Sequence, residues 1–364
     1  MNAPATLPAF DAPAATPDEL RLAFAGSGGE YFKIWIVNLL LSILTLGLYS
    51  AWAKVRRERY FLGNTLLDGS PFEYLADPVK ILKGRLLVMA VIVVANIAAE
   101  FNPLLNLAAT LVFVVLVPWM ISRALRFRAY NTSWRGLRFG FDGLTWDAAK
   151  AWVLWPIAGV LSLGLLFPIA LANQRRYLFT HLRFGQAPFE IDLPLGPVYR
   201  IFGRVGLLAL VYVAVLVALG FVLGGPLGLF AAGDMAQRGG GEVFGLYVML
   251  AMLALYVGFA LIAPYVSARM ANLSFNQANL ENHGFFSDMV AGRYVSIVLT
   301  NWLLTALTLG LYRPFAVVRL WRYRVEHLAL LPAGTLDDFV AVQADEVRVI
   351  GEEAADMLDV DLGF

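Results

Sequence analysis

Hydrophobic and polar positions along this chain repeat one pattern three times: an apolar run ends in a Leu-Gly turn, and a basic segment follows. We name these copies A elements, and they cover residues 31–74, 148–191 and 294–331. Glycine ends helices readily because it adopts a left-handed backbone without steric cost. Each turn is therefore expected to divide a helix in two, at Gly47, Gly164 or Gly310.

Two longer apolar stretches separate the A elements. Residues 85–122 are interrupted near Pro103, and proline disfavours helix at the residue before it. Residues 204–267 are interrupted by a Gly-rich segment. Each stretch is expected to form a pair of helices, B and C, so the chain has the plan A-BC-A-BC-A.

Composition indicates that this pattern belongs to a membrane protein. Hydrophobic residues make up 59% of the 364 positions and charged residues only 15%, whereas soluble domains carry about 25% charged residues. Several apolar runs approach the roughly 20 residues that a helix needs to cross a bilayer. The sequence therefore predicts an all-α integral membrane protein, a helical bundle with internal repeats. It contains no cysteine, which excludes disulfides.

Charge placement bears on whether the A elements cross the membrane, because Lys and Arg concentrate on the cytoplasmic side. If each A element crosses, there are seven transmembrane helices, and nine of the 28 basic residues face outside. If each one dips in and returns, there are four full spans and three re-entrant, half-spanning helices, and only Arg238 lies outside. The run from Lys33 to Gly47 is also only about 21 Å of helix, against a hydrocarbon core of roughly 30 Å. The sequence favours four spans, with seven as the alternative.

The two ends of the chain differ from the single membrane domain expected between them, residues 21–331. Residues 1–20 hold four prolines and acids but no apolar core, so they are predicted to be disordered. Residues 332–364 hold nine acidic residues against one arginine, Arg348. Apolar residues at helical spacing predict a short amphipathic helix in this acidic cytosolic tail. That helix either docks on the basic loops or stays free.

The A elements share an Arg-Tyr pair that suits contact with lipid headgroups or phosphate. Its members are Arg59, Tyr60, Arg176, Tyr177, Arg322 and Tyr323. A guanidinium matches the geometry of phosphate oxygens. Arginine and tyrosine also serve as plain interfacial anchors that fix the depth of a helix. Both interpretations remain open from the sequence.

Three amides lie inside apolar runs. Asn38 and Asn301 occupy the same position in the first and third A elements, nine residues before the glycine, where the second has Trp155. Asn96 lies in the first of the two longer stretches. Such an amide either joins helices by a hydrogen bond or lines a polar path.

Catalysis and metal binding have no positive support in the sequence. No acid lies firmly inside an apolar run, which argues against proton- or sodium-coupled transport. His181, His283 and His327 do not have metal-ligand spacing. We therefore expect no enzymatic activity and no cofactor. Anionic lipid headgroups are nearer partners for the basic loops than nucleic acid.

The first A element also carries a specific string of motifs. The string comprises Phe24-x-Gly26, the stretch 31–35, the stretch 38–54, Arg59-Tyr60 and the stretch 64–69. It resembles the YjgN family of bacterial inner-membrane proteins, over roughly residues 20–364. The resemblance implies a multi-pass protein of the bacterial inner membrane and transfers no functional residues. The second A element departs from this pattern, with Leu166 in place of the tyrosine and Trp155 in place of the asparagine.

The pattern supports two functions. The first is transport or permeation of a small molecule or ion, because internal repeats and re-entrant elements often line such paths. The alternative is a lipid-binding or membrane-organising scaffold, because a basic interfacial segment occurs three times and no charge is buried. In either case the C-terminal tail is expected in the cytoplasm.

Overall fold

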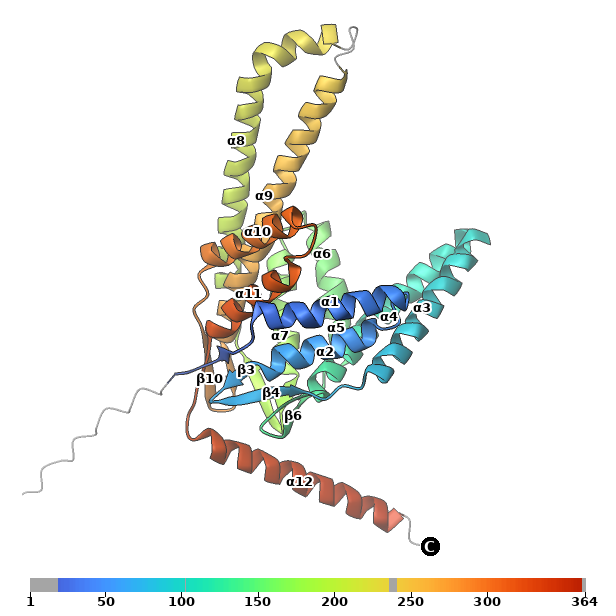
Figure 1. Ribbon diagram of the computed structural model, residues 1–364, viewed down its shortest axis with the longest axis vertical. Coiled ribbons are helices and arrows are strands. Elements are labelled where there is room, and N and C mark those ends of the chain that lie inside the picture. Colours follow the sequence, from blue (N-terminus) through green and yellow to red (C-terminus); the bar gives the residue numbers. More distant parts are fainter. Residues whose placement is uncertain (1–18, 102, 236–240, 362–364) are drawn as a thin grey trace, which may run out of the picture.

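Helical hairpins dominate the computed structural model, which describes residues 19–101, 103–235 and 241–361. Three short hairpins correspond to the A elements. The first pairs α1 (Gly28–Leu44) with α2 (Ser50–Gly63), and the third pairs α10 (Ala291–Leu307) with α11 (Arg313–Glu326). In the second, the consecutive segments α5 (Thr145–Ala149), η1 (Lys150–Leu154) and α6 (Trp155–Leu161) together pair with α7 (Phe167–Thr180). Two long hairpins are α3 (Pro78–Phe101) with α4 (Pro103–Tyr130), and α8 (Leu195–Met235) with α9 (Gly241–Phe275). All these hairpins leave one β-sheet and return to it, and a final helix, α12 (Leu336–Asp361), lies below the sheet in Figure 1.

Local sequence signals set the starts of several helices. The Ser27 hydroxyl accepts the Glu30 N–H at 3.2 Å, and the Glu30 carboxylate accepts the Ser27 N–H at 3.3 Å. This capping box satisfies two backbone donors that the first turn of α1 leaves free. Pro168 and Pro314 lie in the first turns of α7 and α11, where a missing N–H has no cost.

The sheet is antiparallel throughout, and its strands have two to five residues. They are β1 (Leu20–Arg21), β2 (Ala23–Phe24), β3 (Thr65–Leu67), β4 (Ser70–Tyr74), β5 (Thr132–Trp134), β6 (Leu137–Phe141), β7 (Leu182–Phe184), β8 (Ala187–Ile191), β9 (Ala278–Leu280), β10 (His283–Ser287) and β11 (Leu328–Leu331). Residues 20–24 are one extended segment, whose first half pairs with β11 and whose second half pairs with β3. The Leu22 N–H between these halves donates to the Leu328 carbonyl at 3.0 Å. The sheet therefore closes into a ring where the two ends of the folded chain meet.

Four strand pairs of the ring are joined by two-residue turns. These turns are Asp68-Gly69, Arg135-Gly136, Gly185-Gln186 and Glu281-Asn282. In the first two, both residues have positive φ angles, of 49° and 69° at Asp68 and Gly69 and of 46° and 81° at Arg135 and Gly136. Such angles are typical of type I′ turns, whose twist matches that of paired strands.

Side chains fill the inside of the ring. One buried cluster joins residues from β3, β5, β6, β7, β8, β9 and β11, among them Trp134, Phe184 and Phe189. The ring centroids of Phe139 and Phe184 are 5.0 Å apart. Small closed sheets are filled in this way by their inward side chains. The ring is therefore a packed core and not a pore.

The predicted all-α fold is wrong, because eleven strands form this ring. The strands are too short for a two-residue alternation to stand out beside long apolar helices. Four full spans are also wrong, since three helical segments of the described chain are long and apolar enough to cross a membrane: Leu104–Tyr130, Leu195–Ala218 and Met252–Phe275. The alternative of seven transmembrane helices is wrong as well. Each A element reverses at its Leu-Gly turn and ends at the sheet where it began.

Two further predictions concern the ends of the chain. Of the segment predicted to be disordered, residues 1–18 lie outside the described residues, as does Arg238. The acidic tail forms α12, and the start of this helix packs against the ring. Phe339 stacks on Phe184 with ring centroids 6.1 Å apart.

Candidate functional site

The turns of the three short hairpins share one backbone conformation, and we call them the hairpin tips. A leucine and then a glycine have positive φ angles in each: 49° and 92° at Leu46 and Gly47, 54° and 97° at Leu163 and Gly164, and 50° and 93° at Leu309 and Gly310. A hydroxyl closes each turn. Thr45 Oγ1 donates to the Leu41 carbonyl at 2.7 Å and accepts the Tyr49 N–H at 2.9 Å. Thr308 makes the same two bonds with Leu304 and Tyr312.

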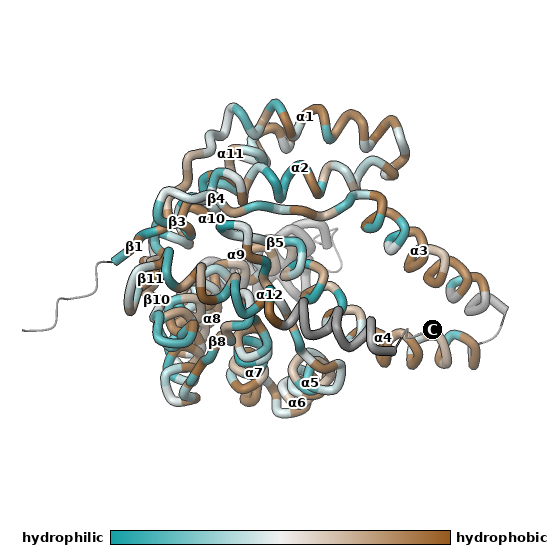
Figure 2. The backbone as a smooth tube through the Cα atoms, turned by 90° about the horizontal axis from the view of Figure 1, so that it is seen from below, coloured by the Kyte–Doolittle hydropathy of each residue, from teal (hydrophilic) through white to brown (hydrophobic). Residues whose placement is uncertain are grey.

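The leucines at the hairpin tips are almost completely exposed. Leu46 is 96% exposed, and Leu163 and Leu309 are each 95% exposed. A left-handed backbone costs a side-chain-bearing residue about 1–2 kcal/mol, and strain of this kind collects at functional positions. In Figure 2 the end of α1 that lies away from the sheet is hydrophobic. Three equivalent, strained and exposed leucines are suited to contact with an apolar phase.

Aromatic and basic side chains lie behind two of the hairpin tips. The rings of Tyr49 and Trp52 stack with centroids 6.0 Å apart, and Arg56 donates to the Tyr49 hydroxyl at 3.2 Å. The first basic residue after Gly47 is Lys54, about 10 Å along the helix at 1.5 Å per residue. Behind the third tip, the rings of Tyr312 and Phe315 stack at 5.7 Å. An apolar tip followed by aromatic and then basic residues has the depth profile of a segment at a membrane interface.

The three tyrosines of the Arg-Tyr pairs tie the two helices of each short hairpin together. The Tyr60 hydroxyl donates to the Ser27 carbonyl at 2.8 Å, and the Tyr177 hydroxyl donates to the Leu144 carbonyl at 3.3 Å. Tyr323 donates to the Val290 carbonyl at 3.1 Å. In each case the acceptor is 33 residues earlier and is the residue just before the first helix. Burial raises the pKa of all three phenols.

The three arginines of these pairs join each hairpin to the end of the second strand that follows it around the ring, or to a residue just after that strand. The acceptors are the carbonyls of Tyr74 for Arg59 at 3.2 Å, Leu193 for Arg176 at 2.6 Å and Gly26 for Arg322 at 2.7 Å. Arg126 on α4 makes the same contact with Phe141 at 3.1 Å, and Asn272 on α9 makes it with Met289 at 2.9 Å. The repeat is thus fivefold, because the long hairpins return to the sheet in the same way. Headgroup contact by these arginines stays a prediction.

The three amides of the apolar runs have three different environments. Asn301 donates to the Ala316 carbonyl on α11 at 3.0 Å, so it joins the two helices of the third hairpin. The side-chain oxygen of Asn38 is buried and has no hydrogen-bond partner within the described residues. Asn96 is exposed and donates to the Ile92 carbonyl of its own helix at 2.8 Å.

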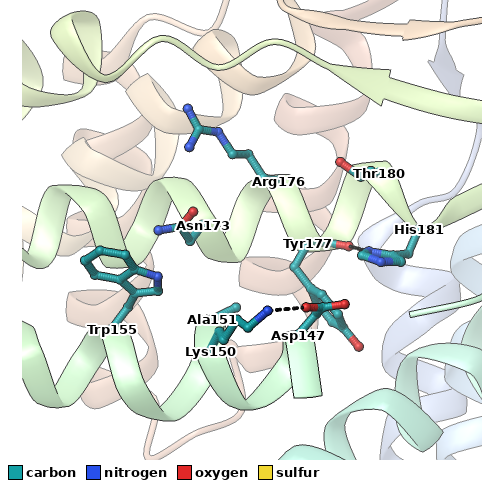
Figure 3. A pocket seen from close by; sticks show the side chains of 9 residues that line it. All are labelled: Asp147, Lys150, Ala151, Trp155, Asn173, Arg176, Tyr177, Thr180 and His181. Carbon is teal, nitrogen blue, oxygen red and sulfur yellow. Dashed lines mark hydrogen bonds and ion pairs between the residues drawn. The ribbon is translucent and has the colours of Figure 1, made fainter. Parts of the chain in front are cut away.

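The second short hairpin contains a cleft of about 200 Å³ between its two helices. It is lined by Asp147, Lys150, Ala151, Trp155, Asn173, Arg176, Tyr177, Thr180 and His181 (Figure 3). Lys150 and Asp147 form an ion pair at 3.0 Å, and Arg176 extends from the other side of α7. The π-helical turn η1 and Trp155 lie where the other A elements have regular helix and asparagine. The second A element therefore differs in sequence from the other two where its structure opens into this cleft. π-helical turns are frequent at functional sites.

Helix α12 covers the end of the ring that carries the two-residue turns. The Gln343 side chain is 1% exposed, and its carbonyl oxygen accepts the N–H groups of Gln186 and Ala187, each at 2.8 Å. Arg135 forms an ion pair with Asp337 at 2.6 Å. Sequence reasoning did not single out Gln343. In the sequence, Gln343 could have been recognised as a polar residue at helical spacing from the apolar Leu336 and Val340.

Comparison with known proteins places this architecture in a family. The family model described as "Bacterial protein of unknown function (DUF898)" matches residues 19–357. The inner membrane protein YjgN of Salmonella typhimurium is 26% identical over 343 residues, covering 82% of this chain and 85% of the relative. YjgN of Escherichia coli (strain K12) is 25% identical over 378 residues, covering 89% and 91%. No solved structure matches this chain.

The YjgN resemblance of the first A element is thus confirmed over most of the chain. Relatives named as inner membrane proteins agree with the apolar helices and support a bacterial inner-membrane location. This chain is similar to the inner-membrane YjgN proteins over 82–89% of its length, and it belongs to the DUF898 family of bacterial proteins.

Proposed function

We propose that this protein binds anionic lipid and organises it in the inner membrane, with the hairpin tips and the basic residues behind them as the contact surface. The observation that carries this proposal is the tip conformation, repeated at Leu46, Leu163 and Leu309. Three exposed leucines contribute about 1.5–3 kcal/mol each when buried in an apolar phase. Basic residues near the surface of an anionic membrane contribute about 1 kcal/mol each.

Lipid binding is better supported than permeation of a solute. A path along the axis of the ring would pass through the aromatic side chains of Trp134, Phe184 and Phe189, which are all buried. Helix α12 covers the end of the same ring. The described residues therefore offer no open route through the sheet. The proposal assigns no catalytic step and no cofactor.

The geometry also supports an orientation in the membrane. All the hairpins start and end at the sheet, and basic residues such as Arg59, Arg126 and Arg322 lie at that end of their helices. Because Lys and Arg stay on the cytoplasmic side, the sheet and α12 belong in the cytoplasm. The second long hairpin, which holds the segments Leu195–Ala218 and Met252–Phe275, then crosses the bilayer and returns, which makes the protein multi-pass.

Native mass spectrometry of the purified protein tests this function. The protein in detergent is titrated with phosphatidylglycerol, cardiolipin or phosphatidylcholine, and the bound lipids are counted. We expect several-fold tighter binding of the two anionic lipids. Replacing Lys54, Arg56 and Arg57 on α2 with glutamine should lower that binding at least threefold, since these exposed side chains lie behind the first tip.

A matched control separates this effect from a general loss of charge. Arg348→Gln removes an exposed charge on α12, where it pairs only with Asp345 within the described residues, and it should leave lipid binding unchanged. Equal binding of phosphatidylglycerol and phosphatidylcholine by the unmodified protein would contradict the proposal. Solute flux through reconstituted vesicles would favour the permeation role instead.

A further inference from the structure

The cleft of the second short hairpin lies between two points where its helices touch. Toward the tip, α6 and α7 are in close contact, because a Cβ atom on Gly159 would lie 2.9 Å from the ring of Phe167. Toward the sheet, the Tyr177 hydroxyl donates to the Leu144 carbonyl at 3.3 Å. Between these two contacts the helices separate and leave the space of about 200 Å³.

The π-helical turn places Trp155 on the wall of this cleft. The Trp155 N–H donates to the carbonyl of Lys150, five residues earlier, so both residues lie on the same side of the helix. In a regular helix, Leu154 would take that place above Lys150. The third hairpin has Asn301 instead, whose amide joins the two helices by donating to the Ala316 carbonyl. The second hairpin makes no such bond within the described residues, and its helices stay apart.

Donor groups without a partner lie on both walls of the cleft. Lys150 pairs with Asp147 at 3.0 Å, which uses one of its three ammonium hydrogens and leaves two. The indole N–H of Trp155 and the amide of Asn173 have no hydrogen-bond partner within the part of the chain that the structure describes. Figure 3 shows Trp155 and Asn173 at the same end of the cleft, with Lys150 next to them.

The end of the cleft toward the sheet offers groups of another kind. Nδ1 of His181 lies 3.0 Å from the Tyr177 carbonyl oxygen. Since a carbonyl oxygen can only accept, Nδ1 carries the hydrogen, and the neutral ring keeps Nε2 as a free acceptor. The Thr180 hydroxyl has no partner among the described residues. This end can therefore bond the hydroxyl groups of a ligand.

The distance of the cleft from the hairpin tip matches the depth of one leaflet of a bilayer. Trp155 and Asn173 lie nine residues before and after Gly164, about 13 Å along the helices at 1.5 Å per residue. Half of the hydrocarbon core is roughly 15 Å. The intervening residues 156–172 carry no charge, and Leu161 among them is 79% exposed. A tip inserted into one leaflet therefore holds the cleft at the level of the lipid headgroups.

We propose that this cleft binds the phosphate ester headgroup of one anionic phospholipid. Lys150 supplies positive charge to the phosphate, and the N–H groups of Trp155 and Asn173 donate to its oxygens. The hydroxyls of a glycerol headgroup then reach Thr180 and His181, and the acyl chains leave toward the tip. This inference deepens the lipid-binding function and rests on it in one respect, because it requires the second tip to lie in the bilayer.

Photochemical cross-linking locates the bound headgroup. The full chain is placed in phosphatidylcholine nanodiscs that contain a small fraction of phosphatidylglycerol with a photoreactive diazirine in its headgroup. After illumination, the cross-linked peptides are identified by mass spectrometry. The cross-links should concentrate on the segments 147–155 and 173–181. An excess of unlabelled phosphatidylglycerol should remove them, whereas the phosphatidylcholine already present does not.

Matched variants connect the cross-links to the proposed contacts. Lys150→Gln and Asn173→Leu should each reduce cross-linking of the cleft at least threefold, and Lys150→Arg should retain it because the charge remains. Lys33→Gln is the control for a general loss of charge, since Lys33 precedes Gly47 by as many residues as Lys150 precedes Gly164. It should leave cross-linking of the cleft unchanged. The Lys150 side chain is 49% exposed, so an unchanged unfolding midpoint should show that Lys150→Gln folds normally.

Two results would overturn the site. One is cross-linking of the unmodified protein that is confined to other segments, and the other is equal cross-linking of the cleft in Lys150→Gln and the unmodified protein. Inorganic phosphate in the buffer separates the two sources of a phosphate group. If free phosphate is the ligand, it should displace the labelled lipid, which would overturn the headgroup assignment. If a headgroup is the ligand, the cross-links should persist.

Failure of this site and failure of the lipid-binding function give different results. Loss of the preference for anionic lipids in native mass spectrometry would contradict the function itself. If that preference is retained while the cleft is not cross-linked, the headgroup site alone is wrong.

Discussion

The hydroxyl of Tyr323 bonds both backbone groups of Val290, accepting its N–H at 2.9 Å and donating to its carbonyl at 3.1 Å. Val290 is the residue before α10, so a side chain on the returning helix closes the first turn of the outgoing helix. Tyr60 makes the same pair of bonds with Ser27. The Arg-Tyr pair therefore has a structural role that its repetition alone did not reveal.

Tyr323→Phe should destabilise the third hairpin. The substitution keeps the ring and removes the hydroxyl that satisfies Val290, which costs about 1 kcal/mol for a typical hydrogen bond. Thermal unfolding in detergent should show a lower midpoint. Tyr130→Phe is the control, since Tyr130 is 59% exposed, and a loss of equal size in that variant would contradict the role of the Tyr323 hydroxyl.

Leu46→Gly should separate the stability of a hairpin tip from its contact with lipid. Glycine relieves the cost of the left-handed conformation, about 1–2 kcal/mol, but makes the unfolded chain more flexible by about 0.4–1 kcal/mol. We expect a gain of about 0.5 kcal/mol in detergent and weaker lipid binding in nanodiscs. Gly47→Ala, at a φ of 92°, should lower stability. A variant Leu46→Gly that binds lipid as well as the unmodified protein would exclude the tip as a contact.

Gln343→Ala should release α12 from the ring. It leaves the N–H groups of Gln186 and Ala187 without their shared acceptor, and each unsatisfied buried donor costs about 1–3 kcal/mol. Limited proteolysis between the ring and the tail should become several-fold faster. Val342→Ala is the control, because Val342 is 55% exposed on the same helix. Equal cleavage rates in all three proteins would show that Gln343 does not hold α12.

Docking of α12 should weaken in acid because of His283. Burial lowers the pKa of this imidazole below the ordinary 6.5, and nearby Glu281 offsets part of that shift. The neutral ring is required, since Nδ1 accepts the Ala333 N–H at 3.1 Å. Because the undocked state binds the proton more readily, the stabilisation is complete above about pH 6.5 and is lost as the pH falls through the lowered pKa.

Hydrogen exchange of residues 336–343 measures this pH dependence. After correction for the intrinsic exchange rate, protection should be lower at about pH 5.5 than at about pH 7.5. His283→Gln should remove most of the difference, since glutamine does not titrate. A difference of the same size in that variant would assign the pH dependence to another group.

The helical part of the fold followed from the sequence because apolar runs and Gly-ended turns are local features. The ring did not, although the Asp68-Gly69 pair is a local signal for a hairpin. Its closure joins Leu20 to Leu330, which no local pattern specifies. The strands that hold Pro71 and Pro188 lie at the ends of the first and second A elements, but each is too short to be recognised as a strand from its sequence alone.

The site residues were partly predictable for the same reason. The repetition of Arg59, Arg176 and Arg322 is visible in the sequence, whereas their acceptors are not. The acceptor of Arg322, Gly26, lies 296 residues away. The leucines of the tips drew attention only through their neighbouring glycines, since exposure and a positive φ angle are properties of the folded chain.

The depth of the hairpin tips in a bilayer tests the proposed function most directly. The chain has no cysteine, so single cysteines at positions 46, 163 and 309 can each carry a spin label in phosphatidylglycerol nanodiscs. The label's accessibility to oxygen is compared with its accessibility to a water-soluble nickel complex, with Val342→Cys as the aqueous reference. Labels at all three tips should be reached by oxygen and shielded from nickel. Nickel accessibility equal to that at position 342 would contradict lipid contact by the tips.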